Sequence, residues 1–397
     1  MQNLSERVKS LSESETLKMA KLSRELTSKG HDIINLNLGE PDFNTPDFIK
    51  EAAKKAIDDN FSHYTPVAGY ADLRKAISDK FKRENDLDFS PEQTLVSTGA
   101  KQSISNAILA LIDPGDEVLV PVPYWVSYKD MISMAGGKTV FLPSGIENKF
   151  KITAEQVEKA ITPKTKMFLF SSPCNPSGVV FSKKELADLA AVFAKHPNIY
   201  IVSDEIYEHI TFTGRHESIA QFDSIKERTI VVNGLSKSFA MTGWRIGYIG
   251  APKWITDACE KIQGQVTSGA SSIAQRAAIA GLNGDLSPTL KMKEEFLKRK
   301  ELIVSLFSEI RGAKFIPPDG AFYLFPDVSF CFGKSFGDIK ISNANDLSMY
   351  LLNTANVSVV SGDAFGDGNC IRISYAASPE KIKEGVRRIS AALGKLD

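Results

Sequence analysis

Short apolar runs alternate with longer amphipathic segments through the middle of the chain. The runs are rich in Val, Ile, Leu and Phe and contain few charged residues. Near-continuous apolar strands are typical of a parallel sheet whose two faces are both covered by helices. The pattern therefore predicts an α/β core with strands at residues 93–97, 117–121, 166–171, 198–203, 229–233 and 245–249.

The pattern changes after residue 284. A charged helical stretch covers residues 291–311, a turn-rich segment follows it, and an apolar strand-like run occupies residues 370–375. We expect a second, smaller α+β unit there. The predicted organisation is an N-terminal arm with part of the small domain (1–45), a large domain (46–284) and a small C-terminal domain (285–397).

Composition narrows the classes of function. The 48 Lys and Arg balance the 48 Asp and Glu, so a general electrostatic attraction to nucleic acid is not expected. No run approaches the ~18 apolar residues of a membrane span, and the polar N-terminus has no signal-peptide pattern, which predicts a cytoplasmic protein. The four cysteines form no C-x-x-C pair and the five histidines no H-E-x-x-H motif. We therefore expect no metal site, and cysteines that act as small buried hydrophobes.

Polar side chains follow the predicted strands. In an open parallel sheet, ligands bind beyond the carboxyl ends of the strands. The residues found there include an amine, a carboxylate, a phenol, an amide and an indole, which is the set that pyridoxal phosphate requires. They are Gly99 to Lys101, Trp125, Asn175, Asp204 with Tyr207, and Ser236 with Lys237.

Three segments carry a family resemblance: Asn-Leu-Gly-Glu-Pro-Asp-Phe at 37–43, Ser-Asp-Glu-Ile-Tyr-Glu at 203–208, and Ser-Lys-Ser-Phe-Ala-Met-Thr-Gly-Trp-Arg-Ile-Gly at 236–247. From about residue 36 to 376 the chain resembles class I pyridoxal-phosphate-dependent aminotransferases. The resemblance implies the aspartate aminotransferase-like fold. That fold has a large domain with a mostly parallel seven-stranded sheet and a smaller α+β domain.

The same resemblance implies how the cofactor is held. Lys237 is expected to form the Schiff base, which needs an amine that is neutral near pH 7. Arg245 and Ser236 resemble the family's phosphate ligands. The start of the helix at Gly99, Ala100 and Lys101 adds backbone amides and a positive dipole end.

Four further residues are expected around the cofactor ring. Asp204 resembles the carboxylate that keeps the pyridine nitrogen protonated, and Tyr207 and Asn175 resemble the donors to its phenolic oxygen. Trp125 is expected to stack on the ring. Structural alternatives remain: Asp204 can cap a helix over residues 205–208, Asn175 can be a turn residue, and Trp125 can be a core aromatic.

The resemblance also implies substrate contacts. Arg372 is expected to clamp the α-carboxylate through its planar fork, with Gly39, Asn175 and Trp125 beside the substrate. Tyr64 resembles the family tyrosine that reaches the phosphate from a neighbouring subunit. That similarity predicts a homodimer with shared active sites.

Segments 97–103, 124–128 and 263–275 resemble the aspartate branch, which includes aspartate/prephenate and glutamate/prephenate enzymes. In that branch the positions of Lys101 and Thr16 recognise the distal carboxylate. Expelling water around an unpaired ammonium is costly, which favours acidic substrates. Lys101 can instead be a surface helix residue, and Thr16 part of a mobile polar arm.

The expected function is therefore an aspartate aminotransferase. It would exchange the amino group between aspartate or glutamate and oxaloacetate or 2-oxoglutarate with ping-pong kinetics, as the small domain and the N-terminal arm close over the substrate. Prephenate, aromatic or alanine aminotransferases, a β-lyase and a cyclopropane-carboxylate synthase share most of these residues. A regulatory module that binds the cofactor without turnover is the non-enzyme alternative. The charge balance, the complete ligand set and the lack of a helix-turn-helix before Leu36 argue against it.

Overall fold

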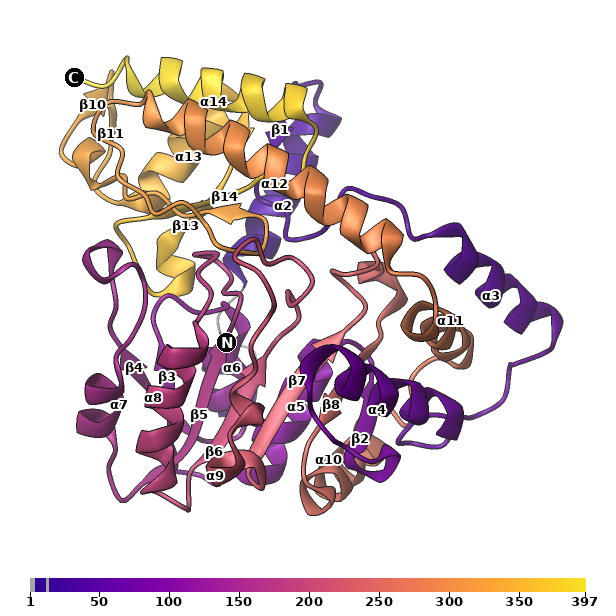
Figure 1. Ribbon diagram of the computed structural model, residues 1–397. Helices are drawn as coiled ribbons and strands as arrows, with labels where there is room; N and C mark the ends of the chain where they lie inside the picture. Colours follow the sequence, from indigo (N-terminus) through magenta and orange to yellow (C-terminus); the bar gives the residue numbers. More distant parts are fainter. Residues whose placement is uncertain (1–3, 12–13) are drawn as a thin grey trace.

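A twisted seven-stranded sheet forms the centre of the computed structural model, which describes residues 4–11 and 14–397 (Figure 1). The strand order is β2-β8-β7-β6-β5-β3-β4. All strands are parallel except β8, which runs antiparallel to both β2 and β7. The strands are β2 (Thr94–Ser97), β3 (Glu117–Pro121), β4 (Lys138–Leu142), β5 (Thr165–Ser171), β6 (Tyr200–Asp204), β7 (Thr229–Gly234) and β8 (Gly247–Gly250).

Each of the six runs predicted from the apolar pattern overlaps one of these strands, with ends that differ by at most two residues. The pattern did not reveal β4, which lies at the edge of the sheet and is only partly buried. β2, at the opposite edge, is fully buried and was predicted, so the weak signal of β4 comes from its exposed side chains, which need not be apolar. The expected fold class, an α/β fold with a mostly parallel seven-stranded sheet, is confirmed.

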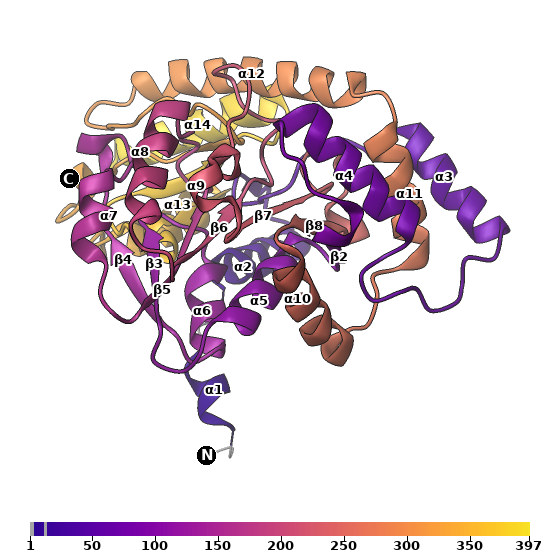
Figure 2. The same cartoon turned by 60° about the horizontal axis from the view of Figure 1, so that its bottom comes forward.

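Helices cover both faces of the sheet. Because side chains alternate along a strand, Ile230 and Val232 pack towards one face and Val231 towards the other. On the first face α5 and α10 lie side by side, with α6 beside them (Figure 2). The helices of the first face are α5 (Ala100–Leu111), α6 (Ser127–Met134) and α10 (Lys253–Val266); those of the other are α3 (Asp47–Asp58), α4 (Ala71–Asn85), α7 (Ala154–Ala160), α8 (Lys183–Ala194), α9 (Asp223–Lys226) and α11 (Ser272–Asn283).

A second unit lies above the carboxyl ends of these strands in Figure 1. It has a three-stranded antiparallel sheet of order β13-β14-β9 and its own apolar core. Near the start of the chain, β1 pairs with β12 of this unit. Its elements are α2 (Glu15–Ser28), β1 (Ile34–Asn35), α12 (Ser287–Ser308), β9 (Tyr323–Leu324), α13 (Ala344–Ala355), β12 (Val357–Ser358), β13 (Val360–Ser361), β14 (Ile371–Ser374) and α14 (Pro379–Leu393).

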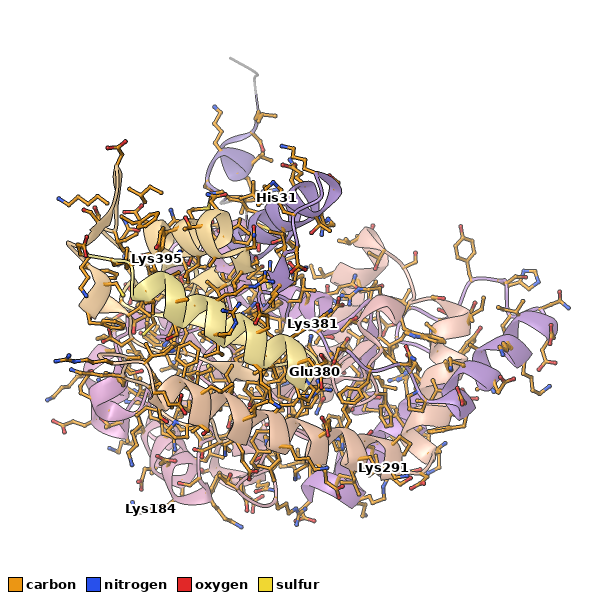
Figure 3. All side chains as sticks on the ribbon, turned by 90° about the horizontal axis from the view of Figure 1, so that it is seen from above. His31, Lys184, Lys291, Glu380, Lys381 and Lys395 are labelled. Atoms are coloured by element: carbon orange, nitrogen blue, oxygen red, sulfur yellow. The ribbon has the colours of Figure 1, made fainter. Side chains whose placement is uncertain are left out.

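The charged stretch predicted after residue 284 is a helix, α12, and the strand-like run at 370–375 contains β14. Polar side chains of the outer helices, among them Lys291 of α12 and Glu380 and Lys381 of α14, are exposed (Figure 3). The remaining elements are α1 (Glu6–Lys9), the hairpin β10 (Ser335–Phe336) and β11 (Ile339–Lys340), and the 3-10 helices Pro91–Gln93, Ile146–Asn148, Ile219–Gln221, Thr242–Trp244, Ser329–Cys331 and Gly362–Phe365. Across the described ranges 4–11 and 14–397, no helix combines the length and apolar character needed to span a bilayer.

Candidate active site

A cavity of about 400 Å³ opens at the carboxyl ends of the parallel strands. Of the predicted site residues, only Gly99 and Tyr64 are absent from its lining. The structure therefore brings together residues that are up to 356 positions apart, from Thr16 to Arg372. The lining residues are Thr16, Leu17, Gly39, Ala100, Lys101, Ile104, Trp125, Ser171, Asn175, Asp204, Ile206, Tyr207, Ser236, Lys237, Thr242, Arg245, Tyr323 and Arg372.

The start of α5 forms one wall of the cavity. Gly99 precedes the helix with φ of 82°, and a Cβ there would collide with the guanidinium of Arg245. Gly99 therefore allows this cation to lie against the helix start. Gly247 of β8 allows a second close approach, because a Cβ there would collide with the backbone of Gly99 and Ala100. The first amides of a helix have no intrahelical partners, so this wall presents N–H donors and a positive charge.

Lys237 follows β7 and its ammonium group donates a hydrogen bond to the carbonyl oxygen of Gly39. Burial lowers the pKa of Lys237 to about 8, aided by the positive charges of Arg372 and Arg245 and opposed by Glu40 and Asp204. A substantial fraction of this amine is therefore neutral near pH 7.5, as a nucleophile or proton acceptor requires.

Asp204 is the last residue of β6 and is 5% exposed. Its carboxylate accepts hydrogen bonds from the Tyr128 hydroxyl at 2.7 Å and from the Ile206 amide at 3.3 Å. Within the described parts of the chain no basic group comes within ion-pair distance of it, and burial raises the pKa of Asp204 to about 6. No helix begins after Asp204, because residues 206–209 form a turn, so the helix-cap alternative is wrong.

Arg372 lies on β14, buried between the rings of Tyr323 and Phe365 at 4.6 and 4.9 Å. Its Nη1 donates to Asn175 Oδ1 at 3.0 Å and its Nη2 donates to the Asn37 carbonyl at 2.7 Å. Burial lowers the pKa of Arg372, though the group remains a cation because a guanidinium pKa starts above 12. Asn175 is itself buried rather than an exposed turn residue.

Two tyrosines, Tyr207 and Tyr323, add hydroxyl groups to the cavity lining. The hydroxyls of Tyr207 and Tyr323 are 2.7 Å apart, and both side chains are buried. Burial raises the pKa of Tyr207 well above its usual value, and the nearby Tyr323 raises it further, so Tyr207 is neutral and able to donate a hydrogen bond.

At the other end of the cavity, Lys101 places its ammonium 5.0 Å from the ring centre of Trp125. Desolvation, followed by the charge of Arg245, lowers the pKa of Lys101. Trp125 is half-buried and packs edge-to-face on Tyr128, with ring centres 5.5 Å apart. Thr16, at the start of α2, shares a hydrogen bond of 2.8 Å with Ser14 and also lines the cavity.

Tyr64 lies apart from this cavity. Its side chain is 99% exposed and borders a surface hollow formed by residues 62–65 and 267–272. Within a single chain, Tyr64 therefore does not reach the site.

Sequence reasoning missed two tyrosines that contact the predicted site residues: Tyr323, which lines the cavity and contacts Tyr207, and Tyr128, which lies behind the lining and donates to Asp204. Tyr128 follows Trp125 by three positions, a spacing that places both on one face of a helix start. That spacing was a usable signal. Tyr323 follows the turn 317–320 in the predicted small domain, and only tertiary packing brings its hydroxyl to Tyr207.

Comparison with known proteins agrees with this geometry. The family model described as "Aminotransferase class I and II" matches residues 31–389. The chain belongs to this family. Among curated relatives of this aminotransferase, the aspartate/prephenate aminotransferase of Nitrosomonas europaea is 47% identical over 98% of this chain and 99% of its own length. The bifunctional aspartate aminotransferase and glutamate/aspartate-prephenate aminotransferase of Petunia hybrida is 47% identical over 98% of this chain and 83% of its own.

Solved structures show the same fold. The aspartate aminotransferase of Rhizobium meliloti superposes with a TM-score of 0.96 at 41% identity, covering 100% of both chains. That of Thermus thermophilus with maleate gives 0.93 at 38% identity, covering 99% of this chain and 100% of that one. The expected aspartate aminotransferase-like fold is therefore confirmed for this aminotransferase.

The family implies a pyridoxal phosphate cofactor, and the residues of this aminotransferase fit that group. Asp204 is a buried carboxylate with no cation beside it in the described structure, which suits a protonated ring nitrogen. Gly99 leaves the helix start open to the Arg245 guanidinium, which suits a phosphate dianion. Lys237 supplies an amine with a lowered pKa in the same cavity.

Proposed function

We propose that this aminotransferase moves the amino group between L-aspartate or L-glutamate and oxaloacetate or 2-oxoglutarate. The observation that carries the proposal is a pair of cations, Arg372 and Lys101, that line one cavity together with Lys237. A dicarboxylic amino acid has two carboxylates to pair with them. Thr16 adds a hydroxyl that can donate to the second carboxylate. A substrate with a neutral side chain has no such carboxylate and leaves Lys101 unpaired, which is unfavourable.

The cofactor is proposed to lie in this cavity against the start of α5. Ser236, Arg245 and the helix start at residues 99–101 are proposed to hold its phosphate. Trp125 is proposed to stack on its ring, and Asp204 is proposed to face its ring nitrogen. The donors proposed for its phenolic oxygen are Tyr207 and Asn175.

Bound pyridoxal phosphate supplies an electron sink that stabilises negative charge at the substrate Cα. Lys237 is proposed to take the Cα proton on Nζ and return it during the second half of the reaction. Its pKa of about 8 suits both directions near neutral pH. Asp204 is proposed to favour positive charge on the ring nitrogen of the bound cofactor, and the Tyr128 hydrogen bond orients that carboxylate.

Arg372 is proposed to orient the substrate by its α-carboxylate. Asn175 and the Asn37 carbonyl already hold the two terminal nitrogens of the guanidinium, so little side-chain entropy remains to be lost on binding. Gly39, whose carbonyl accepts a hydrogen bond from Lys237, also lines the cavity and is proposed to lie beside the substrate. Ping-pong kinetics follow if one amino acid leaves as its keto acid before the second keto acid binds.

The distal-carboxylate role of Lys101 is testable with a specificity ratio. We expect Lys101→Ala to lower kcat/KM for aspartate by about 30-fold or more, the cost of removing one partner of a desolvated charge pair, and to spare turnover of alanine. The control is Lys129→Ala, an exposed lysine on α6 that does not line the cavity. Equal losses for aspartate and alanine would contradict the role.

Prephenate is the second candidate acceptor, because the Nitrosomonas and Petunia relatives carry it in their names. A substrate panel separates the possibilities: aspartate, glutamate, alanine and phenylalanine as donors, with 2-oxoglutarate, oxaloacetate and prephenate as acceptors. The proposal requires aspartate and glutamate to exceed alanine and phenylalanine. Preference for a neutral donor would replace it with an alanine or aromatic aminotransferase.

A homodimer with shared sites is proposed from the placement of Tyr64, whose side chain is fully exposed in one chain. We expect a dimer in analytical ultracentrifugation at micromolar concentration. We also expect Tyr64→Phe to weaken pyridoxal phosphate binding by about tenfold, the worth of one charge-assisted hydrogen bond. His63→Ala, a change at the neighbouring residue, is the control. A monomer that binds the cofactor with undiminished affinity after the Tyr64 change would defeat this proposal.

Three expectations from the sequence stay predictions. They are the division into domains at residues 45 and 284, closure of the small domain with the N-terminal arm over the substrate, and a cytoplasmic location without a nucleic-acid partner. The first residues of the arm, 1–3 and 12–13, lie outside the described structure.

A further inference from the structure

The turn after β6 has two opposite polar faces. Asp204, Ile206 and Tyr207 line the cavity. Glu205 and Glu208, in the same turn, are absent from the cavity lining and are nevertheless almost completely buried, at 1% and 5% exposed. Two carboxylates buried behind the proposed cofactor ligands need an explanation, because burying a carboxylate is expensive without full compensation.

Glu208 is held by the end of α4. Its Oε1 accepts a hydrogen bond from the ammonium of Lys80, and its Oε2 accepts one from Asn85 Nδ2 at 2.7 Å. Lys80 also donates to Asn85 Oδ1 at 2.8 Å and is itself only 1% exposed. In this network both oxygens of Glu208 have a donor, and Glu84 and His209 border it: Glu84 lies 3.8 Å from Lys80, and His209 lies 3.5 Å from Glu208.

Glu205 is held separately. Its Oε1 accepts from the hydroxyls of Ser203 and Ser218 at 2.8 and 2.7 Å, and its Oε2 lies 2.9 Å from His216 Nε2. Although His216, Glu205 and Glu208 are close enough to suggest a metal site, all four carboxylate oxygens already have protein partners. The cluster is therefore a hydrogen-bonded ion-pair network.

Stability alone gives little reason for such a network. A buried ion pair gains about as much as its desolvation costs, and well-packed neutral residues can replace it without loss of stability. Burial acts to raise the pKa of Glu208, but Lys80, His209 and His216 outweigh it and bring that pKa to about 2. The neighbouring cations therefore favour the ionised carboxylate, which keeps its contacts with Lys80 and Asn85 of α4.

Hydrogen bonds within the turn link Glu208 to the cavity residues Tyr207 and Asp204. The Glu208 amide donates to the Glu205 carbonyl at 2.9 Å, and the Ile210 amide donates to the Tyr207 carbonyl at 2.8 Å. Tyr207 is the residue immediately before Glu208, so a displacement of the Glu208 side chain is passed to its hydroxyl through this short hydrogen-bonded turn. Asp204 is tied to the same turn through the Ile206 amide.

We propose that Lys80 and Asn85, acting through Glu208, are positioning residues that hold Tyr207 and Asp204 in register with the cofactor. This inference rests on the proposed function, since it assigns Tyr207 and Asp204 to the cofactor. Lys80 and Asn85 do not line the cavity, so they lie outside the proposed substrate and cofactor site.

The test uses the purified, cofactor-loaded enzyme carrying Lys80→Met and Glu208→Gln together. The double change removes both charges and keeps the side-chain volumes, so an unpaired buried charge is avoided. We expect kcat to fall by about tenfold, because small misplacement of a catalytic group is costly, while KM for aspartate changes by less than about threefold. We also expect the apparent pKa of the visible cofactor band to rise, since a displaced Tyr207 stabilises the ionised phenolic oxygen less well.

The matched control is Lys151→Met with Glu185→Gln. Lys151 also pairs with a glutamate, at 2.9 Å, and also lies beside a phenylalanine ring, but neither residue lines the cavity. We expect its kcat and its visible-band pKa to match those of the unmodified enzyme. If the Lys80 and Glu208 double variant gives the same result as this control, the pair is only structural and the inference is wrong.

A second variant covers the case in which the double variant does not fold. Asn85→Leu keeps the size of the side chain and removes no charge, so Lys80 and Glu208 remain paired. We expect a kcat about threefold lower and a smaller band shift in the same direction, as for loss of one hydrogen bond. Unchanged values would overturn the inference. Failure of the proposed function is recognised separately, because the unmodified enzyme would then show neither the visible band nor aspartate turnover.

Discussion

Replacing Lys237 by Ala is expected to abolish the visible absorbance of the cofactor-loaded protein and to lower kcat by about 10⁶-fold, the loss typical of removing a covalent catalyst. The reason is that, among the described residues, no second amine lies at the position of Lys237 in the cavity. Arg245 and Arg372 carry guanidinium groups rather than amines, and Lys101, the other lysine of the cavity lining, lies at the start of α5 against Trp125. Absorbance spectra and single-turnover kinetics with aspartate measure both effects.

Mass spectrometry after borohydride reduction provides an independent readout. The unmodified chain is expected to gain the mass of one cofactor on a peptide that contains Lys237, and the alanine variant to gain none. Lys101→Ala serves as the matched control and is expected to retain the covalent adduct. A visible band or an adduct at another lysine in the Lys237→Ala protein would remove the central assignment of the site.

Asp204→Asn is expected to lower kcat by about 10³-fold, in line with the loss of one electrostatic partner from a preorganised site. The amide keeps the shape of the carboxylate and can still accept from Tyr128, so the change removes mainly the negative charge. Tyr128→Phe removes only one of the two hydrogen bonds and is expected to cost about tenfold. Equal activities of the Asn variant and the unmodified enzyme would contradict the proposed role.

Unfolding of the cofactor-free protein gives the matching stability measurement. Burial raises the pKa of Asp204 to about 6, above the usual 3.8. The native state therefore binds more protons than the unfolded state between these values, so ionising Asp204 costs stability as the pH rises from about 4 to 6. Asp204→Asn removes that cost. We expect the variant to be more stable above pH 6, by up to about 3 kcal/mol in urea unfolding, with the difference shrinking at lower pH.

Local signals predicted most of the sheet. The strands buried on both faces carry continuous apolar runs, so each of the six predicted segments overlaps a strand. The pattern did not predict the edge strand β4, because its exposed side chains do not need to be apolar. Periodicity also does not encode direction, and the antiparallel course of β8 follows from its hydrogen bonds to β2 and β7.

The site was predicted as a set of residues, with roles supplied by a family resemblance. Strand ends and turn residues are local features, and they placed Asn175, Asp204 and Lys237 at one edge of the sheet. The contacts between these residues are not local. Arg372 reaches Asn175, and Tyr323 reaches Tyr207, only because the second unit packs over that edge.

By itself the sequence determined the α/β core, the absence of a strong net charge and the inventory of reactive side chains, since these depend on composition and on periodicity along a few turns or strands. Tertiary structure alone decided the lowered pKa of Lys237, the raised pKa of Asp204 and the anchoring of Glu208 by α4. The physical reason is that burial and electrostatic energy depend on distances in space between residues far apart in the chain, which a linear pattern does not contain.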